Sequence, residues 1–427
     1  MEIEARKLKS LLALAKRAAD GKSYMPALRC VRLAVVAGLL RLDATDRKSW
    51  LTLTAPAEGD LPPVAVDLGK VALVLGAKAK RSSTEIANLT VGWKPGPAPS
   101  SCKTPHPEKP GLLCDERPGH SKKHSAYEIG VGRVEWECAA IELPAVPDEP
   151  VLHVEVGART FTIPATRTEG FPKRPEVGAA RQVVSYDSER LAEALAYVLP
   201  AAGADETRRH LCGLWLRGRD VFALDGHRLH VAGGFPAIKK SPAFLSTSAA
   251  TALRAVLAAA AGPAELHVHE ATSKAARSGA TWWRVPLAGG AHAELHSAWS
   301  DIGPPPVEQI VPEPKNATVR VEVERTALAE AFALAGKVST RGTARVSVNG
   351  AFKVTTESAE GGEVVEELPA KITGELEAGV NAGYMVEALA ALPARVVLAS
   401  EGDPLAPLRL DGVRGERRFA VVMPVRL

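Results

Sequence analysis

Residues 206–234, ETRRHLCGLWLRGRDVFALDGHRLHVAGG, decide the fold of this chain. Two strand-like runs rich in Leu, Val, Trp and Phe flank a Gly-Arg-Asp turn, and the segment LDGHRL follows them. A second short signature, MPVRL, occupies residues 423–427. Each motif is short, so its weight depends on the pattern of the rest of the chain.

Around these motifs, one coarse pattern occurs three times: an amphipathic helix, short strands, a second helix and more strands. In the first helix of the first copy, Leu8, Leu11, Leu12 and Ala15 recur at helical spacing. This pattern predicts an internal repeat of whole domains. Its helices are expected at 4–20 and 67–78, at 187–203 and 246–262, and at 324–339 and 381–392.

Two Pro-rich stretches, 162–177 and 299–314, look like extended connectors between domains. They predict three domains, at residues 1–177, 178–314 and 315–427. The first domain is longer than the others, and its excess lies near residues 95–126, which are dense in Pro, Gly, Ser and charge. We expect an inserted, largely irregular loop there.

Composition sets broad limits on the class of protein. The 427 residues are 46% hydrophobic and 24% charged, and no apolar run approaches the roughly 18 residues that a membrane span needs. Five cysteines are few and odd in number, which argues against a disulfide framework. We therefore expect a cytoplasmic, nucleoid-associated protein with no membrane contact. The net charge of +4 permits a polyanionic partner without requiring one.

The two motifs and the threefold pattern together carry a resemblance. The segment Asp225–Leu229 (DGHRL) and the terminal MPVRL resemble signatures of the bacterial DNA polymerase III beta sliding clamp family. The resemblance covers nearly the whole chain except the insert. It implies an α+β fold of three repeated DNA-clamp domains, each with two helices and antiparallel sheets, which assemble into a homodimeric ring.

The resemblance also implies a function and a set of partners. The protein would be a non-catalytic processivity factor without cofactors that encircles duplex DNA regardless of sequence. It would tether the DNA polymerase III catalytic subunit, the clamp loader and other proteins that carry clamp-binding motifs. A rival hypothesis is a clamp paralogue that serves repair, a mobile element or inhibitor tolerance.

A sliding ring needs diffuse positive charge on its inner wall, because counterion release is independent of base sequence. The first helix and the turn after it supply part of that charge. The family also places DNA-facing residues in the loop before Leu211. The plain alternative is that these residues form a solvated helix face and an exposed loop. The DNA-contact candidates are Lys7, Lys9, Lys16, Arg17, Lys22, Arg208, Arg209 and His210.

Partner peptides would bind an apolar cleft between the second and third domains, as in peptide-in-groove recognition. By motif match, its lining comes from the LDGHRL segment, the connector and the end of the chain. Val421 and Val422 have a simpler explanation as residues of a last strand. The cleft candidates are Leu211, Leu224, Gly226, His227, Arg228, Leu229, Pro305, Val421, Val422, Met423, Pro424, Val425, Arg426 and Leu427.

The sequence departs from the family pattern at several of these positions. Many relatives have a small hydroxyl residue where this chain has Leu224, and basic residues are frequent where it has Glu308 and Gln309. Peptide preference is therefore expected to differ. Lys337 stands where the family tends to place an apolar residue at the dimer contact, so ring closure is expected to be weaker or compensated elsewhere.

Two other kinds of chemistry were weighed against the clamp. Asp225, His227 and His230 could form an acid–base cluster, but no nucleophile elbow, phosphate loop or HExxH motif accompanies them. The insert could supply zinc ligands, although the ligand spacing matches no common zinc finger and a solvated loop is the simpler expectation. The zinc candidates are Cys102, His106, Cys114, His120 and His124.

Overall fold

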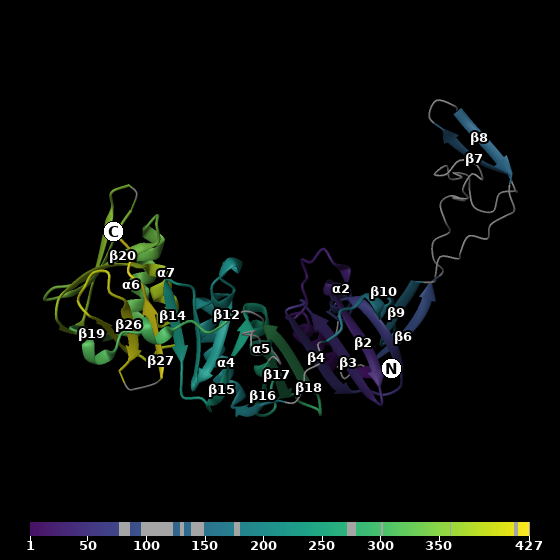
Figure 1. Ribbon diagram of the computed structural model, residues 1–427, viewed down its shortest axis with the longest axis horizontal. Helices are drawn as coiled ribbons and strands as arrows, with labels where there is room; N and C mark the ends of the chain where they lie inside the picture. The colour runs from purple at the N-terminus through teal and green to yellow at the C-terminus, as the bar shows by residue number, and fades with distance from the viewer. Residues whose placement is uncertain are drawn as a thin grey trace. The chain divides into compact units, whose positions relative to one another are not determined.

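The structure is a computed structural model of the whole chain, dominated by antiparallel strands with a few short helices (Figure 1). It describes residues 1–76, 86–94, 123–128, 132–137, 149–174, 180–270, 279–299, 302–358, 360–413 and 417–426. The chain divides into two compact units. The first contains residues 1–9, 32–38 and 57–171, and the second contains residues 10–31, 39–56 and 172–427.

The first unit is built on a sheet with the strand order β1-β6-β9-β10-β5-β2. Met1 is fixed to this sheet, because its ammonium group donates to the carbonyl of Leu89 at 3.1 Å. A separate hairpin consists of β7 (Lys123–Glu128) and β8 (Gly132–Glu137). The other elements are β1 (Glu2–Glu4), β2 (Cys30–Val36), β5 (Leu61–Asp67), α3 (Leu68–Gly76), β6 (Ile86–Lys94), β9 (Glu149–Val156), β10 (Arg159–Thr166) and the short helix η1 (Thr168–Gly170).

The second unit contains three runs of hydrogen-bonded strands. One has the order β3-β4-β18-β17-β16-β11, the second β15-β12-β13-β14-β27-β26-β25-β19-β23, and the third β22-β21-β20-β24. Its early elements are α2 (Pro26–Arg29), β3 (Leu39–Thr45), β4 (Ser49–Pro56), β11 (Gln182–Tyr186), α4 (Ser188–Val198), η2 (Leu199–Ala201), η3 (Glu206–Leu211), β12 (Gly213–Gly218), β13 (Asp220–Leu224), β14 (Arg228–Ala232), β15 (Ile238–Ser246), α5 (Thr247–Leu257), β16 (Ala264–Glu270), β17 (Gly279–Pro286) and β18 (His292–Trp299).

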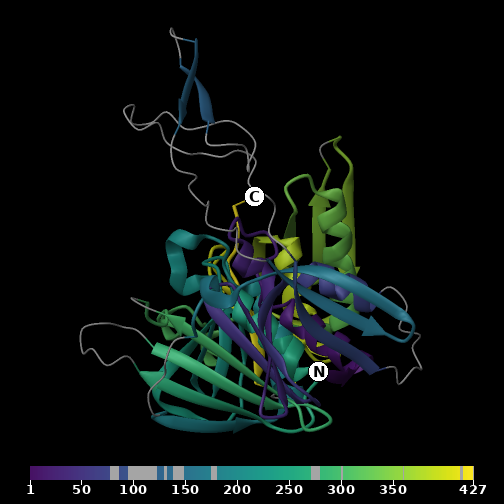
Figure 2. The ribbon, with the colours of Figure 1, turned by 90° about the vertical axis from the view of Figure 1, so that its right-hand side faces the viewer.

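The later part of this unit begins with two short helices and continues with strands and two longer helices. Helix α6 packs along the four-stranded sheet (Figure 2). The elements are η4 (Val307–Gln309), η5 (Pro314–Asn316), β19 (Val319–Glu324), α6 (Arg325–Val338), β20 (Thr343–Val348), β21 (Phe352–Glu357), β22 (Glu363–Leu368), β23 (Ala370–Thr373), β24 (Leu376–Asn381), α7 (Ala382–Leu389), β25 (Arg395–Ser400), β26 (Leu408–Gly412) and β27 (Arg418–Val422).

The first helix, α1 (Ala5–Ala15), follows the apolar stripe read from the sequence. Leu8, Leu11, Leu12 and Ala15 are all buried, which confirms the helical spacing. The helix is shorter than expected: residues 16–19 continue as turns, with the amide of Arg17 donating to the carbonyl of Leu14. No helix in the described ranges is long and apolar enough to cross a bilayer.

Four of the other helices, α4, α5, α6 and α7, begin where the sequence offers a capping side chain. Asp187 accepts from the amide of Arg190 at the start of α4, and Ser246 accepts from the amide of Ala249 at the start of α5. Glu324 and Asn381 cap α6 and α7 in the same way. Because each cap satisfies an otherwise unpaired N–H, the residue before the apolar stripe sets the start of the helix.

The order of elements repeats three times along the chain. Among the described elements of each copy, a strand leads into a helix and four strands follow, or five in the third copy. A second helix is then followed by three more strands, with the β7–β8 hairpin added in the first copy. The third strand after the first helix of one copy pairs antiparallel with the last strand of the next copy. Thus β4 pairs with β18, and β14 pairs with β27.

The described residues overlap the expected insert only at its end. Residues 123–126 are not irregular, because they belong to strand β7, which pairs with β8 over six residues. The runs KHSAYE and GRVEWE have the length and composition of short strands. The remainder of the expected loop, from residue 95 to 122, lies outside the described residues.

Candidate functional site

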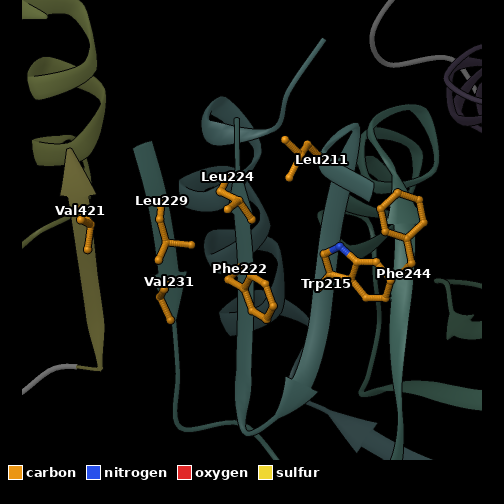
Figure 3. Packing of buried hydrophobic residues seen from close by; sticks show 8 residues of the cluster. All are labelled: Leu211, Trp215, Phe222, Leu224, Leu229, Val231, Phe244 and Val421. Carbon is orange, nitrogen blue, oxygen red and sulfur yellow. The ribbon is translucent and has the colours of Figure 1, made fainter. Parts of the chain in front are cut away.

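One face of the nine-stranded sheet carries a compact group of apolar side chains, which we call the sheet cluster (Figure 3). The side chains come from β12, β13, β14, β15 and β27 and from the segment before β12 (Figure 3). All of them are at most 6% exposed. The cluster consists of Leu211, Trp215, Phe222, Leu224, Leu229, Val231, Phe244 and Val421.

Strand register explains why these residues meet. Leu224 lies opposite Leu229 on the neighbouring strand, and Leu229 lies opposite Val421. Directly paired residues of antiparallel strands project to the same face of the sheet, so the three side chains form one row. The structure therefore brings together four of the cleft candidates, Leu211, Leu224, Leu229 and Val421.

The connector before the third copy lies over this cluster. Ile302, Val307 and Val311 are partly buried and pack against it, as do Trp299 and Phe419. The connector is further held by an ion pair between Arg217 on β12 and Glu308.

The turn between β13 and β14 is organised by Asp225. Its Oδ1 accepts hydrogen bonds from the amides of His227, at 2.8 Å, and Arg228, at 3.0 Å. Gly226 has a φ of +97°, a conformation that residues with a Cβ rarely adopt. The Asp-Gly pair therefore fixes the turn, which leaves Gly226 and His227 exposed at its tip.

Two cleft candidates point away from the sheet cluster. Arg228 pairs with Val422, and alternation places both on the face opposite Leu229. The Arg228 side chain is 9% exposed, lies 4.1 Å above the ring of Tyr384 and pairs with Asp225 and Glu387. Val422 is fully buried. These two residues hold β14 and β27 together from behind, rather than lining the cluster.

The final residues are tied down by backbone hydrogen bonds. The amide of Met423 donates to the carbonyl of His227 at 2.8 Å, and the amide of Val425 donates to the carbonyl of Gly379 at 2.9 Å. Met423, Pro424 and Val425 are half-buried, and Arg426 is exposed. Pro305 is buried in the connector, and Leu427 lies outside the described residues.

Sequence reasoning missed half of the sheet cluster. Trp215, Phe222, Val231 and Phe244 belong to it, although none was among the cleft candidates. The alternation of large apolar residues along 213–231 was the available signal, because every second residue of a strand faces the same way. That alternation does not reveal the order of the strands in the sheet. It therefore cannot show which apolar side chains of neighbouring strands meet.

The DNA-contact candidates lie on exposed segments. Lys9 on α1 is exposed, as are Lys16, Arg17 and Lys22 in the turns that follow, and Lys7 is half-buried. Arg208 and Arg209 are exposed on η3, where Arg208 pairs with Asp205 at 3.0 Å. The carbonyl of His210 accepts a hydrogen bond from the indole of Trp215, which fixes this segment to β12.

The other helices carry little net positive charge. Helix α4 presents Glu189, Arg190 and Glu193, whereas α5 contributes only Arg254 as a charged residue. On α6, Lys337 is exposed in the last turn, where a cation is favourable beside the helix C-terminus. The positive charge of the helices is therefore concentrated on α1 and the turns after it.

The possible acid–base cluster does not form. The Asp225 carboxylate is engaged by the turn and by Arg228, while His227 is exposed at its tip. His230 is fully buried, stacks on Tyr197 and has its Nδ1 2.8 Å from the Tyr197 carbonyl oxygen. Burial lowers the pKa of His230 from 6.5 to about 4, so this imidazole is neutral at physiological pH.

The buried His230 gives a pH-dependent stability. The unfolded chain protonates this residue near pH 6.5 and the folded chain only near pH 4, so stability is full above about pH 6.5 and falls as pH drops toward 4. In urea titrations, we expect the slope of unfolding free energy against pH in this window to be steeper than in His230→Gln by about 1.4 kcal/mol per pH unit. Equal slopes would contradict a neutral, buried His230.

The zinc candidates cannot be placed. Cys102, His106, Cys114 and His120 lie outside the described residues, and His124 is in β7 but its side chain is not described. Within the described residues, no group of three or more His, Cys, Asp or Glu side chains could hold a metal ion. The zinc hypothesis for the insert stays a prediction.

Known structures with a similar fold were found by comparison. The structure is similar to that of the DNA polymerase III beta subunit from Thermotoga maritima, with a TM-score of 0.74 and 17% identity over 100% of this chain and 99% of that chain. A DNA polymerase sliding clamp from Caulobacter crescentus gives a TM-score of 0.75 at 18% identity, with the same coverage. A sliding clamp from Pseudomonas aeruginosa, bound to griselimycin, gives a TM-score of 0.73 at 19% sequence identity, also with the same coverage.

The chain therefore has the fold of a DNA sliding clamp along its whole length. Residues 309–426 match the family described as the DNA polymerase III beta subunit, C-terminal domain. The search of curated proteins gave no match. The α+β fold of repeated clamp domains is confirmed, whereas the boundaries of the three domains stay a prediction.

Proposed function

We propose that this protein is a DNA sliding clamp, a non-catalytic processivity factor that encircles duplex DNA and tethers a DNA polymerase. The observation that carries the proposal is the repeated junction between copies, in which β4 pairs with β18 and β14 pairs with β27. A contact between the third strand after the first helix of one copy and the last strand of the next copy joins the copies head to tail. It leaves one such strand without its partner at each end of the series.

Those two strands are β22 and β10. Strand β22 is the edge of the four-stranded sheet, and Val365 on it is 51% exposed. Strand β10 pairs with β9 along most of its length, whereas its other side meets β5 only at Ala165 and Thr166. Unpaired edges are templates for another chain. A second copy can therefore add the missing junction twice and close a homodimeric ring.

The charges of the two edges favour this contact. Strand β22 carries Glu363, Glu366 and Glu367, and β10 has Arg159 at its start and Arg167 immediately after its end. Opposite charge selects the pairing of β22 with β10 and disfavours pairing of like edges. The proposal thus includes a homodimer in which each junction repeats those within the chain.

Within such a ring, the cations of α1 and its turns, together with Arg208 and Arg209, would contact phosphates without reading bases. The polymerase, the clamp loader and other partners would use short hydrophobic-aromatic peptides. Their docking surface would be the sheet cluster beside Met423, where the connector residues Ile302 and Val307 form an adaptable cover. Action on DNA implies a place in the cell interior, and we extend this to the cytoplasm and nucleoid.

Light scattering and loading onto DNA test the clamp proposal directly. We expect a dimer of twice 45.0 kDa at micromolar concentration, retained on nicked circular DNA and released when the circle is cut. A linear duplex of the same sequence is the matched control, because a ring slides off free ends. A protein that is only monomeric and is not retained on the circle would refute the proposal.

A further inference from the structure

A pocket of about 510 Å³ opens in the second unit beside the sheet cluster, with which it shares Phe244. We call it the aromatic pocket and define it by Trp50, Phe244, Trp299, Arg47, Lys48 and Arg209. These residues come from β4, β15, β18, the β3–β4 turn and η3. A volume in this range suits a small molecule or a single group of a larger ligand.

The apolar wall of the pocket is made of aromatic rings. Trp50 and Trp299 are half-buried, and Phe244 is 6% exposed. The Trp299 and Phe244 rings meet edge to face, with centroids 6.5 Å apart. Such rings offer flat surfaces on which another aromatic group can stack.

The rim of the pocket is positively charged. Arg47, Lys48 and Arg209 are exposed and line the pocket together with one carboxylate, Glu206. Lys48 and Glu206 are 3.2 Å apart, but their side chains are 65% and 82% exposed. An exposed pair of this kind contributes little stability, so Lys48 can exchange Glu206 for an anionic ligand at small cost.

The β3–β4 turn holds Arg47 in an unusual conformation. Its φ is +72°, in the left-handed region that residues with a Cβ seldom occupy. The turn is fixed by Asp46, whose Oδ1 accepts from the amides of Lys48, at 3.0 Å, and Ser49, at 2.7 Å. The hairpin turn therefore holds Arg47 and Lys48 in a fixed position at the rim of the pocket.

We propose that the aromatic pocket binds one unstacked nucleotide of single-stranded DNA. A base would stack on Trp50 or Trp299, and the adjacent phosphates would meet Arg47, Lys48 and Arg209. Aromatic platforms beside a cationic track are the general means by which proteins hold single strands without sequence preference. Duplex DNA does not fit this role, because its bases are stacked inside the helix and cannot enter a pocket.

The inference rests on the proposed function for the source of the ligand. Arg209 belongs to η3 and is itself a candidate duplex contact, together with Arg208 and His210 of the same segment. A clamp beside a primer end has duplex and single strand within reach of the same segment. The aromatic pocket would then hold the unpaired strand while the cations of α1 and the turns after it hold the duplex.

Binding of a fluorescein-labelled octathymidylate, followed by anisotropy, tests the proposal. Because stacking contributes about 1–3 kcal/mol per base, Trp50→Ala should weaken binding roughly five- to 150-fold. The double variant Arg47→Ala/Arg209→Ala should lower the slope of log affinity against log salt by about 1.4, since each lost phosphate contact removes about 0.7. Thymidine monophosphate should bind more weakly than the oligonucleotide, because it has one phosphate.

Lys239→Ala/Lys371→Ala is the matched control, because it also removes two exposed cations but lies outside the pocket. This variant should have an affinity for octathymidylate, and a slope of log affinity against log salt, close to those of the parent protein. Cys212, which lines the pocket, gives an independent readout: bound octathymidylate should protect this thiol from iodoacetamide, measured on its peptide by mass spectrometry. Burial raises the pKa of the Cys212 thiol, so labelling needs mildly alkaline solution.

Two results would overturn the inference. The first is octathymidylate affinity unchanged in both Trp50→Ala and Arg47→Ala/Arg209→Ala. The second is protection of Cys212 by a clamp-binding peptide but not by the oligonucleotide, which would make the pocket a protein site. Retention on nicked circular DNA is measured in parallel. Normal retention with no oligonucleotide binding would refute this inference alone, whereas lost retention in the parent protein would refute the clamp.

Discussion

A chain that ends at Val422 is expected to lose binding to a hydrophobic-aromatic clamp-binding peptide, with the dissociation constant rising at least about a hundredfold, or roughly 2.7 kcal/mol. Met423 lies beside the sheet cluster through the hydrogen bond from its amide to His227. Its flexible thioether side chain can adapt to different peptide side chains. Removing residues 423–427 takes away the Met423 side chain and the rest of the chain end beside the sheet cluster. Fluorescence anisotropy of a labelled peptide measures the loss of binding.

The truncation should leave the fold intact. Strand β27 ends at Val422 and keeps its pairing with β14 and β26. Among the backbone hydrogen bonds of the described residues, the truncation removes those donated by Met423 and Val425. Leu405→Ala is a suitable control, because it removes a 54% exposed apolar side chain outside the sheet cluster. If the truncated chain binds the peptide as tightly as the parent, the docking surface lies elsewhere.

Reversing the charge of β22 is expected to separate the dimer. In Glu363→Arg/Glu366→Arg, two cations of one copy would face Arg159 and Arg167, at the two ends of β10 of the other. Like charges at a strand contact repel, so the dimer dissociation constant should rise at least tenfold, which is about 1.4 kcal/mol. Sedimentation velocity over a concentration series measures the change.

The partner reversal, Arg159→Glu/Arg167→Glu, should have the same effect, and the quadruple variant should restore the dimer because opposite charges face each other again. Such rescue distinguishes a direct contact from general damage. Glu58→Arg/Glu401→Arg, which reverses two exposed acids away from β22 and β10, should remain dimeric. Absence of rescue would show that these strands do not meet.

The helices could largely be predicted from the sequence, because their signals are local. Asp187, Ser246, Glu324 and Asn381 each precede an apolar stripe, and each caps the helix that follows. The end of α1 was placed too late. Residues 16–19 are Lys-Arg-Ala-Ala, which have good helix propensity, but the chain leaves the helix there in turns.

The candidate site was only partly predictable, because it depends on long-range register. Leu224, Leu229 and Val421 were named from motifs, and the pairing of β13, β14 and β27 brings them into one row. Arg228 and Val422 were named for the same surface, but strand alternation turns them to the opposite face.

Apart from Arg209, which is one of the DNA-contact candidates, the residues of the aromatic pocket carried no signal in the sequence. Its six defining residues lie between positions 47 and 299, on separate elements that meet only in the folded chain. Each of them looks ordinary in isolation: a Trp on a strand or an Arg in a turn. Only the proximity of indoles and cations makes a site, and proximity between distant segments is set by the tertiary fold.

The junction between copies has a geometric consequence. A contact in which one end of a molecule fits the other end of the next is heterologous, and it makes a closed ring only if successive rotations add up to a full turn. If they do not, the same contact builds an open helical filament. Substitutions that alter the angle at β14–β27, without weakening the pairing, are therefore expected to convert rings into fibres. The angle at the junction, rather than the strength of the strand contact, decides whether the assembly closes into a ring with a central hole.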